Sequence, residues 1–227
     1  MGLKLSPPSM GGVRKAILWL LTAGALAGSA SILGTLRHPA DPVRHGYLSV
    51  PPAPVARMVM GFENLAADAL YMRFASYWGY QLTHGRHFQN LAPILNLIVD
   101  LDPGFKPAYD LGALALADSG QVDAAIALLD KGAKHHPNDY WYPYQAGFTL
   151  FFFGDDYLRA AHYYERAAAL PGAPPEARYF IARMYEKATR KDLALDVWRR
   201  IFETSPDPSV RQVAKNSLER LGVNVKI

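Results

Sequence analysis

The stretch YWYPYQAGFTLFFFGDDYLRAAHYYERAAALP, residues 140–171, decides the fold. It contains two segments rich in apolar residues, and Gly154 lies between them. In the second segment Ala160, Tyr164 and Ala167 are four and then three residues apart, which places them on one face of a helix. The stretch therefore predicts two helices joined by a turn.

The same pattern recurs on both sides of this stretch. Pro103, Pro137, Pro171 and Pro206 are separated by 34, 34 and 35 residues. Other residue types recur at the same spacing of 34 or 35 positions, and we call each such set a ladder. In the first helix a small residue recurs (Gly79, Ala113, Gly147, Ala182), and an apolar residue recurs three positions later (Leu82, Leu116, Leu150, Tyr185). The turn is marked by Gly85, Gly120, Gly154 and, in the last unit, Thr189-Arg190. Three further sets recur after the turn, in the second helix (Leu91, Ala125, Ala160, Ala194; Leu95, Leu129, Tyr164, Trp198; Ile98, Gly132, Ala167, Ile201).

A repeated helical hairpin explains each ladder. One hairpin cannot bury its apolar face alone, so successive hairpins stack on one another. The small residue in the first helix lets the second helix pack closely against it. A glycine in the turn accepts a positive φ, and the proline ends the second helix.

These residues resemble the tetratricopeptide-repeat family over about Leu70–Asp207, and the best units are Lys106–Pro137 and Tyr140–Pro171. The resemblance implies an all-α helix–turn–helix solenoid of about four repeats over residues 57–221. A terminal helix, Pro208–Leu221, would cap it, as solenoids require. One residue is inserted after Gly154, and the first and last units depart most from the family pattern.

The N-terminal region predicts a membrane segment. Residues 16–36 carry no charge and follow Lys4, Arg14 and Lys15. A helix of that length rises about 30 Å, the thickness of a hydrocarbon core. An uncleaved anchor fits because apolar residues continue to Leu36, but Ala25-Leu26-Ala27 also fits the end of a cleaved signal peptide. A buried helix of a soluble protein is the third alternative.

The charges around this segment predict its orientation. More Lys and Arg precede it than follow it, so residues 1–15 are expected in the cytoplasm and the repeats on the periplasmic side of a bacterial inner membrane. Residues 37–56 contain five prolines and should form an extended linker. Met58–Gln81 is expected to form one long helix leading into the repeats, similar to the lead helices of bacterial membrane-anchored repeat proteins.

Composition and motifs argue against several functional classes. The chain has no cysteine, which excludes disulfides, thiolate metal sites and a cysteine nucleophile. The net charge of +4 is scattered, so no nucleic-acid partner is predicted. His84 with His87, and His135 with His136, lack a third ligand at a recognisable spacing, so no metal and no cofactor are predicted. No catalytic motif was found, and the chain is predicted not to be an enzyme.

The inward face of the first helices predicts a protein-binding site. Solenoids use this concave face to bind partners, and aromatic and Arg side chains dominate binding hot spots. The third unit is unusually aromatic there. The predicted binding residues are Arg73, Tyr80, Leu114, Trp141, Tyr144, Phe148, Phe151, Phe152, Tyr179 and Arg183. The aromatic residues could instead pack against the chain's own linker, Leu48–Ala56.

Together these features predict a membrane-anchored scaffold for protein–protein interaction. It would serve a bacterial envelope complex as an accessory subunit or an assembly factor. The alternative is a constitutive structural subunit of a large membrane assembly, for example a photosynthetic or respiratory one, in which the aromatic face is permanently covered.

Overall fold

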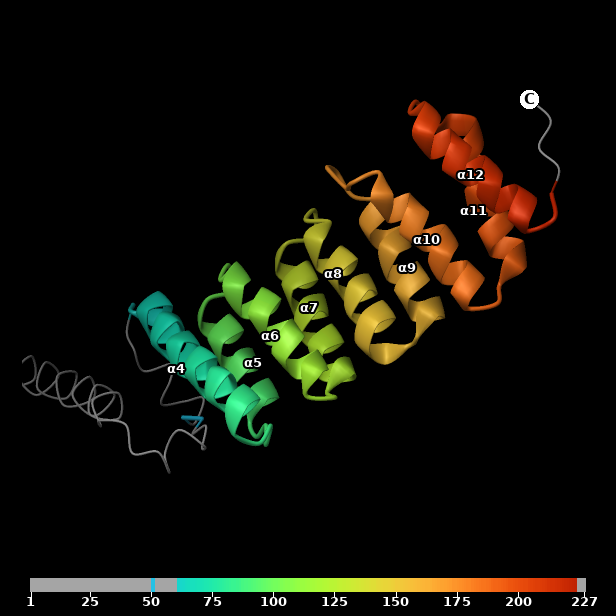
Figure 1. The fold of residues 1–227 in the computed structure, drawn as a ribbon. Coiled ribbons are helices and arrows are strands. Elements are labelled where there is room, and N and C mark those ends of the chain that lie inside the picture. The colour runs from blue at the N-terminus through green and yellow to red at the C-terminus, as the bar shows by residue number, and fades with distance from the viewer. Residues whose placement is uncertain (1–49, 52–60, 224–227) are drawn as a thin grey trace, which may run out of the picture. The chain divides into compact units, whose positions relative to one another are not determined.

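The computed structural model describes residues 50–51 and 61–223, all within the second of two compact units, Gly46–Ile227. The described residues form helices and no strand (Figure 1). The helices are α4 (Glu63–His84), α5 (Leu91–Leu101), α6 (Lys106–Asp118), α7 (Val122–His135), α8 (Trp141–Thr149), the π-helix η2 (Leu150–Gly154), α9 (Tyr157–Ala168), α10 (Glu176–Lys187), α11 (Lys191–Thr204) and α12 (Pro208–Arg220). The predicted N-terminus 1–15 and membrane segment 16–36 lie outside the described residues, as does the linker 37–56 apart from Val50 and Pro51.

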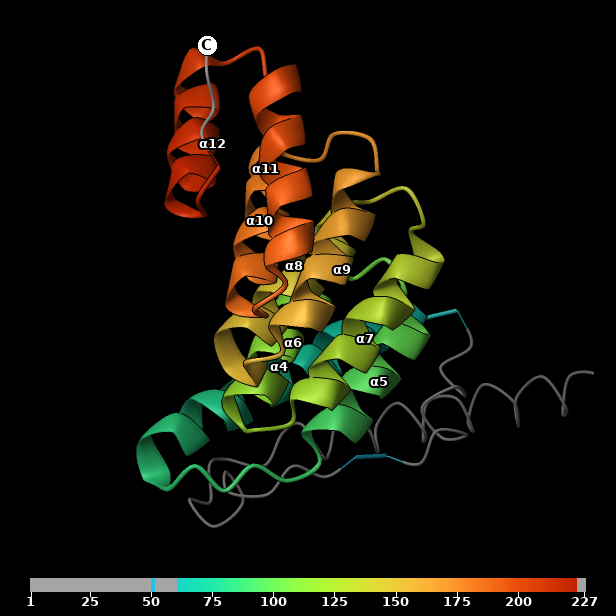
Figure 2. The same cartoon turned by 90° about the vertical axis from the view of Figure 1, so that its right-hand side faces the viewer.

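The helices form four successive hairpins followed by a single helix. The hairpins are α4–α5, α6–α7, α8–η2–α9 and α10–α11, and each lies next to the one that follows it in the chain (Figure 1). Turned by 90°, the first helices α4, α6, α8 and α10 form one layer and the second helices form the other (Figure 2). The described residues form a tetratricopeptide-like helical repeat.

The second helices follow the predicted ladders. All twelve ladder residues after the turn are buried, from Leu91, Leu95 and Ile98 in α5 to Ala194, Trp198 and Ile201 in α11. In each hairpin the side chains four and three residues apart share one face and pack on the first helix. The prediction of the second helices is confirmed.

The predicted close-packing residue of the first helices is confirmed in three units and wrong in one. A Cβ on Gly147 would lie 3.0 Å from the ring of Tyr164, so the second helix does approach closely there. A Cβ on Gly79 would meet nothing within 4 Å, and Leu82 is 38% exposed. The residue of α4 that takes the buried position of Leu116 in α6 is Gln81, 35 residues earlier, and not the predicted Leu82. The phase of the first unit is shifted by one residue.

The turns also differ from the prediction in one unit. Gly85 and Gly120 have positive φ as expected, and Thr189 takes the same region in the last unit. In the third unit Asp155 has the positive φ of 48°, whereas Gly154 ends the π-helix. A π-helix places one more residue in a turn than an α-helix. The inserted residue is therefore absorbed inside the helix, and the turn moves to Asp155.

The first helix begins later than predicted. Gly61 has φ of +92° and its N–H donates to the Glu63 carboxylate at 3.2 Å, so the helix starts at Glu63 instead of Met58. It also continues past Gln81 to His84. Among the helices described, none has the length and apolar character needed to cross a membrane.

Helix α12 is attached to α10 and α11 through the Glu186 carboxylate. The Arg220 guanidinium binds it at 2.8 and 3.1 Å, and the buried indole N–H of Trp198 donates to it at 2.7 Å. Only 12% of the Glu186 side chain is exposed. This charged network ties the last helix to the last hairpin where a cap was predicted.

Candidate protein-interaction face

A cluster of exposed phenylalanine rings lies on α8 and η2. The rings of Phe148 and Phe152 stack with centroids 5.7 Å apart and an interplanar angle of 14°. Phe148 is 38% exposed and Phe152 is 64% exposed. Burying such rings releases about 1.5–3 kcal/mol each, so leaving them in water is costly. We call Tyr144, Phe148, Phe151 and Phe152 the aromatic patch.

The π-helix contributes to this exposure. In α6 the residue equivalent to Phe152 is Asp118, the last residue of the helix. The third unit instead continues through η2, so Phe151, Phe152 and Phe153 all lie in the widened turn. Single π-turns of this kind occur frequently at functional sites.

Tyr144 joins the patch to the core beneath it. Its ring meets the ring of Tyr164 edge-on at 5.3 Å and that of Phe180 at 6.2 Å. Tyr164 is fully buried and stacks on Phe180 at 5.2 Å. Burial raises the pKa of both tyrosines, with Glu176 adding to the effect at Tyr144. Both phenols are therefore neutral, and the Tyr144 end of the patch packs on the rings of Tyr164 and Phe180.

One cation from α10, Lys187, contacts the patch. The Lys187 ammonium lies 4.9 Å from the ring centroid of Tyr157 and 5.6 Å from that of Phe151, both within cation–π range. Arg183 is half-buried and occupies the place in α10 that Phe148 has in α8. In the part of the chain that the structure describes, neither cation has a carboxylate within ion-pair distance. Lys187 was not among the predicted binding residues, and its contact with the ring of Tyr157 depends on how two separate helices meet.

Three other predicted residues come from α6, α8 and α10. Leu114 is 41% exposed on α6. Trp141 is half-buried beneath the Lys106 ammonium, which lies 4.7 Å from its ring. Tyr179 packs edge-on against Trp198 at 5.2 Å, so its ring supports the last hairpin.

The two predicted residues of the first unit do not join the patch. Tyr80 stacks on His84 at 4.0 Å within its own helix, and Arg73 is half-buried on α4. Nothing described brings either of them into contact with the aromatic patch. The reason is the shifted phase of α4, which turns Met72 and Gly79 to the places predicted for Arg73 and Tyr80.

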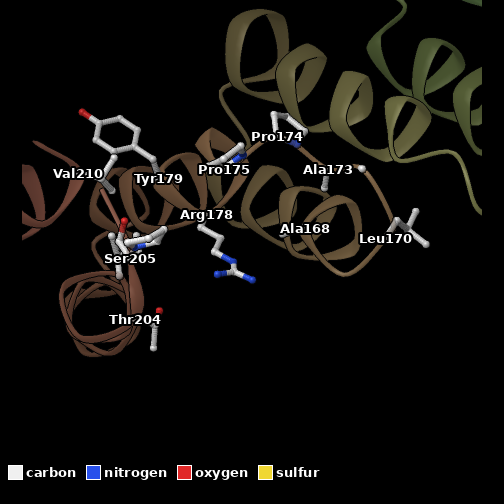
Figure 3. A pocket seen from close by; sticks show the side chains of 13 residues that line it. Ala168, Leu170, Ala173, Pro174, Pro175, Arg178, Tyr179, Thr204, Ser205 and Val210 are labelled. Atoms are coloured by element: carbon white, nitrogen blue, oxygen red, sulfur yellow. The ribbon is translucent and has the colours of Figure 1, made fainter. Parts of the chain in front are cut away.

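A separate pocket of about 350 Å³ lies at the far ends of the last hairpins. It is lined by the loop Leu170–Pro175, the end of α11 and the start of α12, with Arg178 and Tyr179 from α10 (Figure 3). Arg178 is its only charged lining residue and is exposed.

The histidines lie in places with structural explanations. His84 binds the carbonyl oxygen of Tyr80 at 3.0 Å, and His136 stacks on Tyr142 and binds the carbonyl oxygen of Pro103 at 3.1 Å. No group of three or more His, Asp or Glu side chains suited to a metal ion occurs in the described ranges.

The sequence matches no protein-family model and no curated protein. Among solved structures, the crystal structure of MamA protein is similar over 77% of this chain and 87% of that chain, with 15% sequence identity and a TM-score of 0.45. A likeness of this size carries no conclusion about what the chain binds. The functional argument therefore uses only the residues of this chain.

Proposed function

We propose that the chain is a scaffold that binds a protein partner through the aromatic patch. The observation that carries the proposal is that the rings of Phe148 and Phe152 form an exposed, stacked pair. Monomeric proteins rarely leave clustered apolar side chains open to water unless they bind something there. Aromatic side chains in the centre of an interface also contribute most of its binding energy.

We further propose that the uncharged segment 16–36 anchors this scaffold in a bacterial inner membrane. The repeats then lie on the periplasmic side, and the chain serves an envelope complex as an accessory subunit or an assembly factor. Anchoring would raise the local concentration of the scaffold around a membrane-bound partner. The proposal needs no catalytic group, and the chain acts by holding its partner in place. Reporter domains fused to each end of the full chain test the orientation.

The patch is tested with the double substitution Phe148→Ala and Phe152→Ala in the full chain. Partner recovery after crosslinking in native membranes and detergent solubilisation is expected to fall about tenfold or more, since a lost hot-spot side chain costs about 2 kcal/mol. Circular dichroism should show an unchanged helical content, because both rings are exposed.

The matched control is the pair Leu82→Ala and Val213→Ala. These side chains are 38% and 40% exposed on α4 and α12, outside the helices that carry the patch. Partner recovery should be unchanged in this control. Equal recovery with the control and with the patch variant would refute the proposed function. Recovery of the wild-type chain only as part of one inseparable assembly would instead favour a constitutive structural subunit.

A further inference from the structure

Helix α10 carries a row of residues along the side that meets α8 and η2. The ring of Phe180 lies 6.2 Å from that of Tyr144, and the Lys187 ammonium lies 5.6 Å from the ring centroid of Phe151. Phe180 and Lys187 are seven residues apart, so they lie on one face of the helix. Arg183 lies between them at steps of three and four residues and shares that face. The row therefore runs beside the aromatic patch from Tyr144 to Phe151.

The charge along this row is uneven. Glu176 lies four residues before Phe180, and it raises the pKa of Tyr144 in addition to the larger effect of burial. Arg183 and Lys187 lie at the other end, about 16 Å from Glu176 in the case of Lys187, at 1.5 Å per residue. Within the described ranges neither of these two cations has an ion-pair partner. The Phe151 end of the patch is therefore positively charged, and the Tyr144 end has a carboxylate beside it.

A partner that covers Phe148 and Phe152 also removes water from these cations. A charge that loses its water is costly unless an opposite charge or hydrogen bonds replace it. The rings beside Lys187 replace part of the water through cation–π contact. A carboxylate supplies the rest, and a guanidinium such as that of Arg183 can bind it through two parallel hydrogen bonds. The covering segment must therefore bring negative charge to this end.

We propose that the partner's segment on the aromatic patch carries apolar side chains next to carboxylates, and that these carboxylates bind Arg183 and Lys187. The inference rests on the proposed function, because it names the chemistry of the partner at the same patch. The apolar side chains pack on Phe148 and Phe152. Glu176 keeps the acidic residues of the partner at the Lys187 end, since like charges across an interface are unfavourable.

An anionic lipid surface is the other class of partner that exposed rings and cations suit. Lipid phosphates would face the whole row, including Glu176, and would be repelled there. A protein segment places each charge at a fixed position, so it can match a row with opposite charges at its two ends. The charge pattern of α10 therefore favours a protein segment.

A peptide library tests the charge preference without the native partner. Random peptides of about twelve residues, long enough to span the row as a helix, are displayed on phage and selected on the purified full chain in detergent. We expect the enriched peptides to combine Phe, Leu or Trp with Asp or Glu. Selection on Arg183→Glu with Lys187→Glu should enrich Lys and Arg in place of the acidic residues.

The matched control reverses two other cations, Lys134→Glu with Arg200→Glu. It changes the net charge equally, and both residues are exposed on second helices, α7 and α11. Peptides selected on this control should remain acidic. A synthetic copy of one enriched peptide should bind Arg183→Glu with Lys187→Glu about tenfold or more weakly than wild type. Replacing the carboxylates of the peptide by amides should weaken its binding to wild type by a similar factor.

The native partner gives a second measurement. Its recovery after crosslinking in native membranes should fall about tenfold or more for Arg183→Glu with Lys187→Glu, and should be unchanged in the control. The milder Arg183→Gln with Lys187→Gln should give an intermediate loss. Circular dichroism checks that each variant is folded, and the Gln variant decides the result if the charge reversal unfolds the chain.

The outcomes separate this proposal from the proposed function. Binding that is lost on Phe148→Ala with Phe152→Ala but not on charge reversal would overturn the acidic partner and leave the patch as the binding site. Binding that neither variant weakens would overturn both. Selection that enriches no peptide, or peptides without an acidic bias, would overturn the acidic partner. Binding to phosphatidylglycerol vesicles that the charge reversal abolishes, with partner recovery unchanged, would assign the two cations to a lipid surface.

Discussion

At the scale of residues, one glycine, Gly132, allows two tyrosine rings to pack closely against helix α7. A methyl group on Gly132 would overlap the ring of Tyr142 and lie 3.0 Å from the ring of Tyr109. Both tyrosines are buried, so their rings have no room to move. Gly132 in α7 is therefore kept small by the hairpin that follows it.

We predict that Gly132→Ala lowers the free energy of unfolding, because overpacking a core costs about 1–3 kcal/mol. The higher helix propensity of alanine offsets only about 1 kcal/mol. The matched control is Ala127→Gly on the exposed side of the same helix, which should lose about 1 kcal/mol through propensity alone. Urea denaturation measures both. An increase in stability for Gly132→Ala would show that the tyrosine rings give way.

At the scale of elements, the hairpins are joined by polar contacts that span helices distant in the chain. Tyr163 in α9 donates to Asp130 in α7 at 2.6 Å. Glu186 in α10 binds both Trp198 in α11 and Arg220 in α12. One carboxylate that is almost buried thus joins the last three helices, alongside the buried Ala214 and Leu218 of α12.

We predict that Glu186→Ala lowers the free energy of unfolding by about 1–3 kcal/mol, because the buried indole N–H of Trp198 loses its acceptor. Glu186→Gln keeps an acceptor and loses the charge, so its loss should be smaller. Hydrogen exchange should rise chiefly in α12. Glu203→Ala, at an exposed carboxylate of α11, is the control and should change stability little. Unchanged exchange in α12 would contradict the role given to Glu186.

At the scale of the whole molecule, buried tyrosines link the hairpins along the stack. Burial raises the pKa of Tyr142 to about 12, with Asp139 adding to the effect. The pKa of Tyr163 is also raised to about 12, by burial first and then by its hydrogen bond to Asp130. Their ordinary pKa is 10.0, so in both cases the folded state favours the neutral phenol.

This arrangement predicts loss of stability at alkaline pH. Below pH 10 the tyrosines are neutral in both states and the contribution is fully present. As the pH rises from 10 through 12 the unfolded chain loses protons first, and the free energy of unfolding falls. Helical circular dichroism and tyrosinate absorbance should change together in this range. Tyr163→Phe should make the fall shallower, and constant stability up to pH 12 would contradict the prediction.

Much of the fold could be predicted because its cause is local and repeated. The ladder from Leu91 to Ala194 and the prolines after each second helix are visible in the sequence, since helical period and chain-breaking residues act over a few positions. The exposed aromatic character of Phe148 and Phe152 followed from the same period. Both therefore needed only the sequence.

Other features were decided by tertiary packing. The repeat period predicted which residues of α4 face the core, but the prediction was wrong by one position. The burial of Gln81 and the exposure of Gly79 in the folded protein show which face of α4 packs inward. The sequence showed an extra residue near Gly154, but only packing of η2 between its neighbours placed it inside the helix. The position of Lys187 over Tyr157 depends on how two separate helices meet. The sequence of a segment determines whether it forms a helix and which of its faces is apolar. The contacts between helices are determined by the packing of the whole stack.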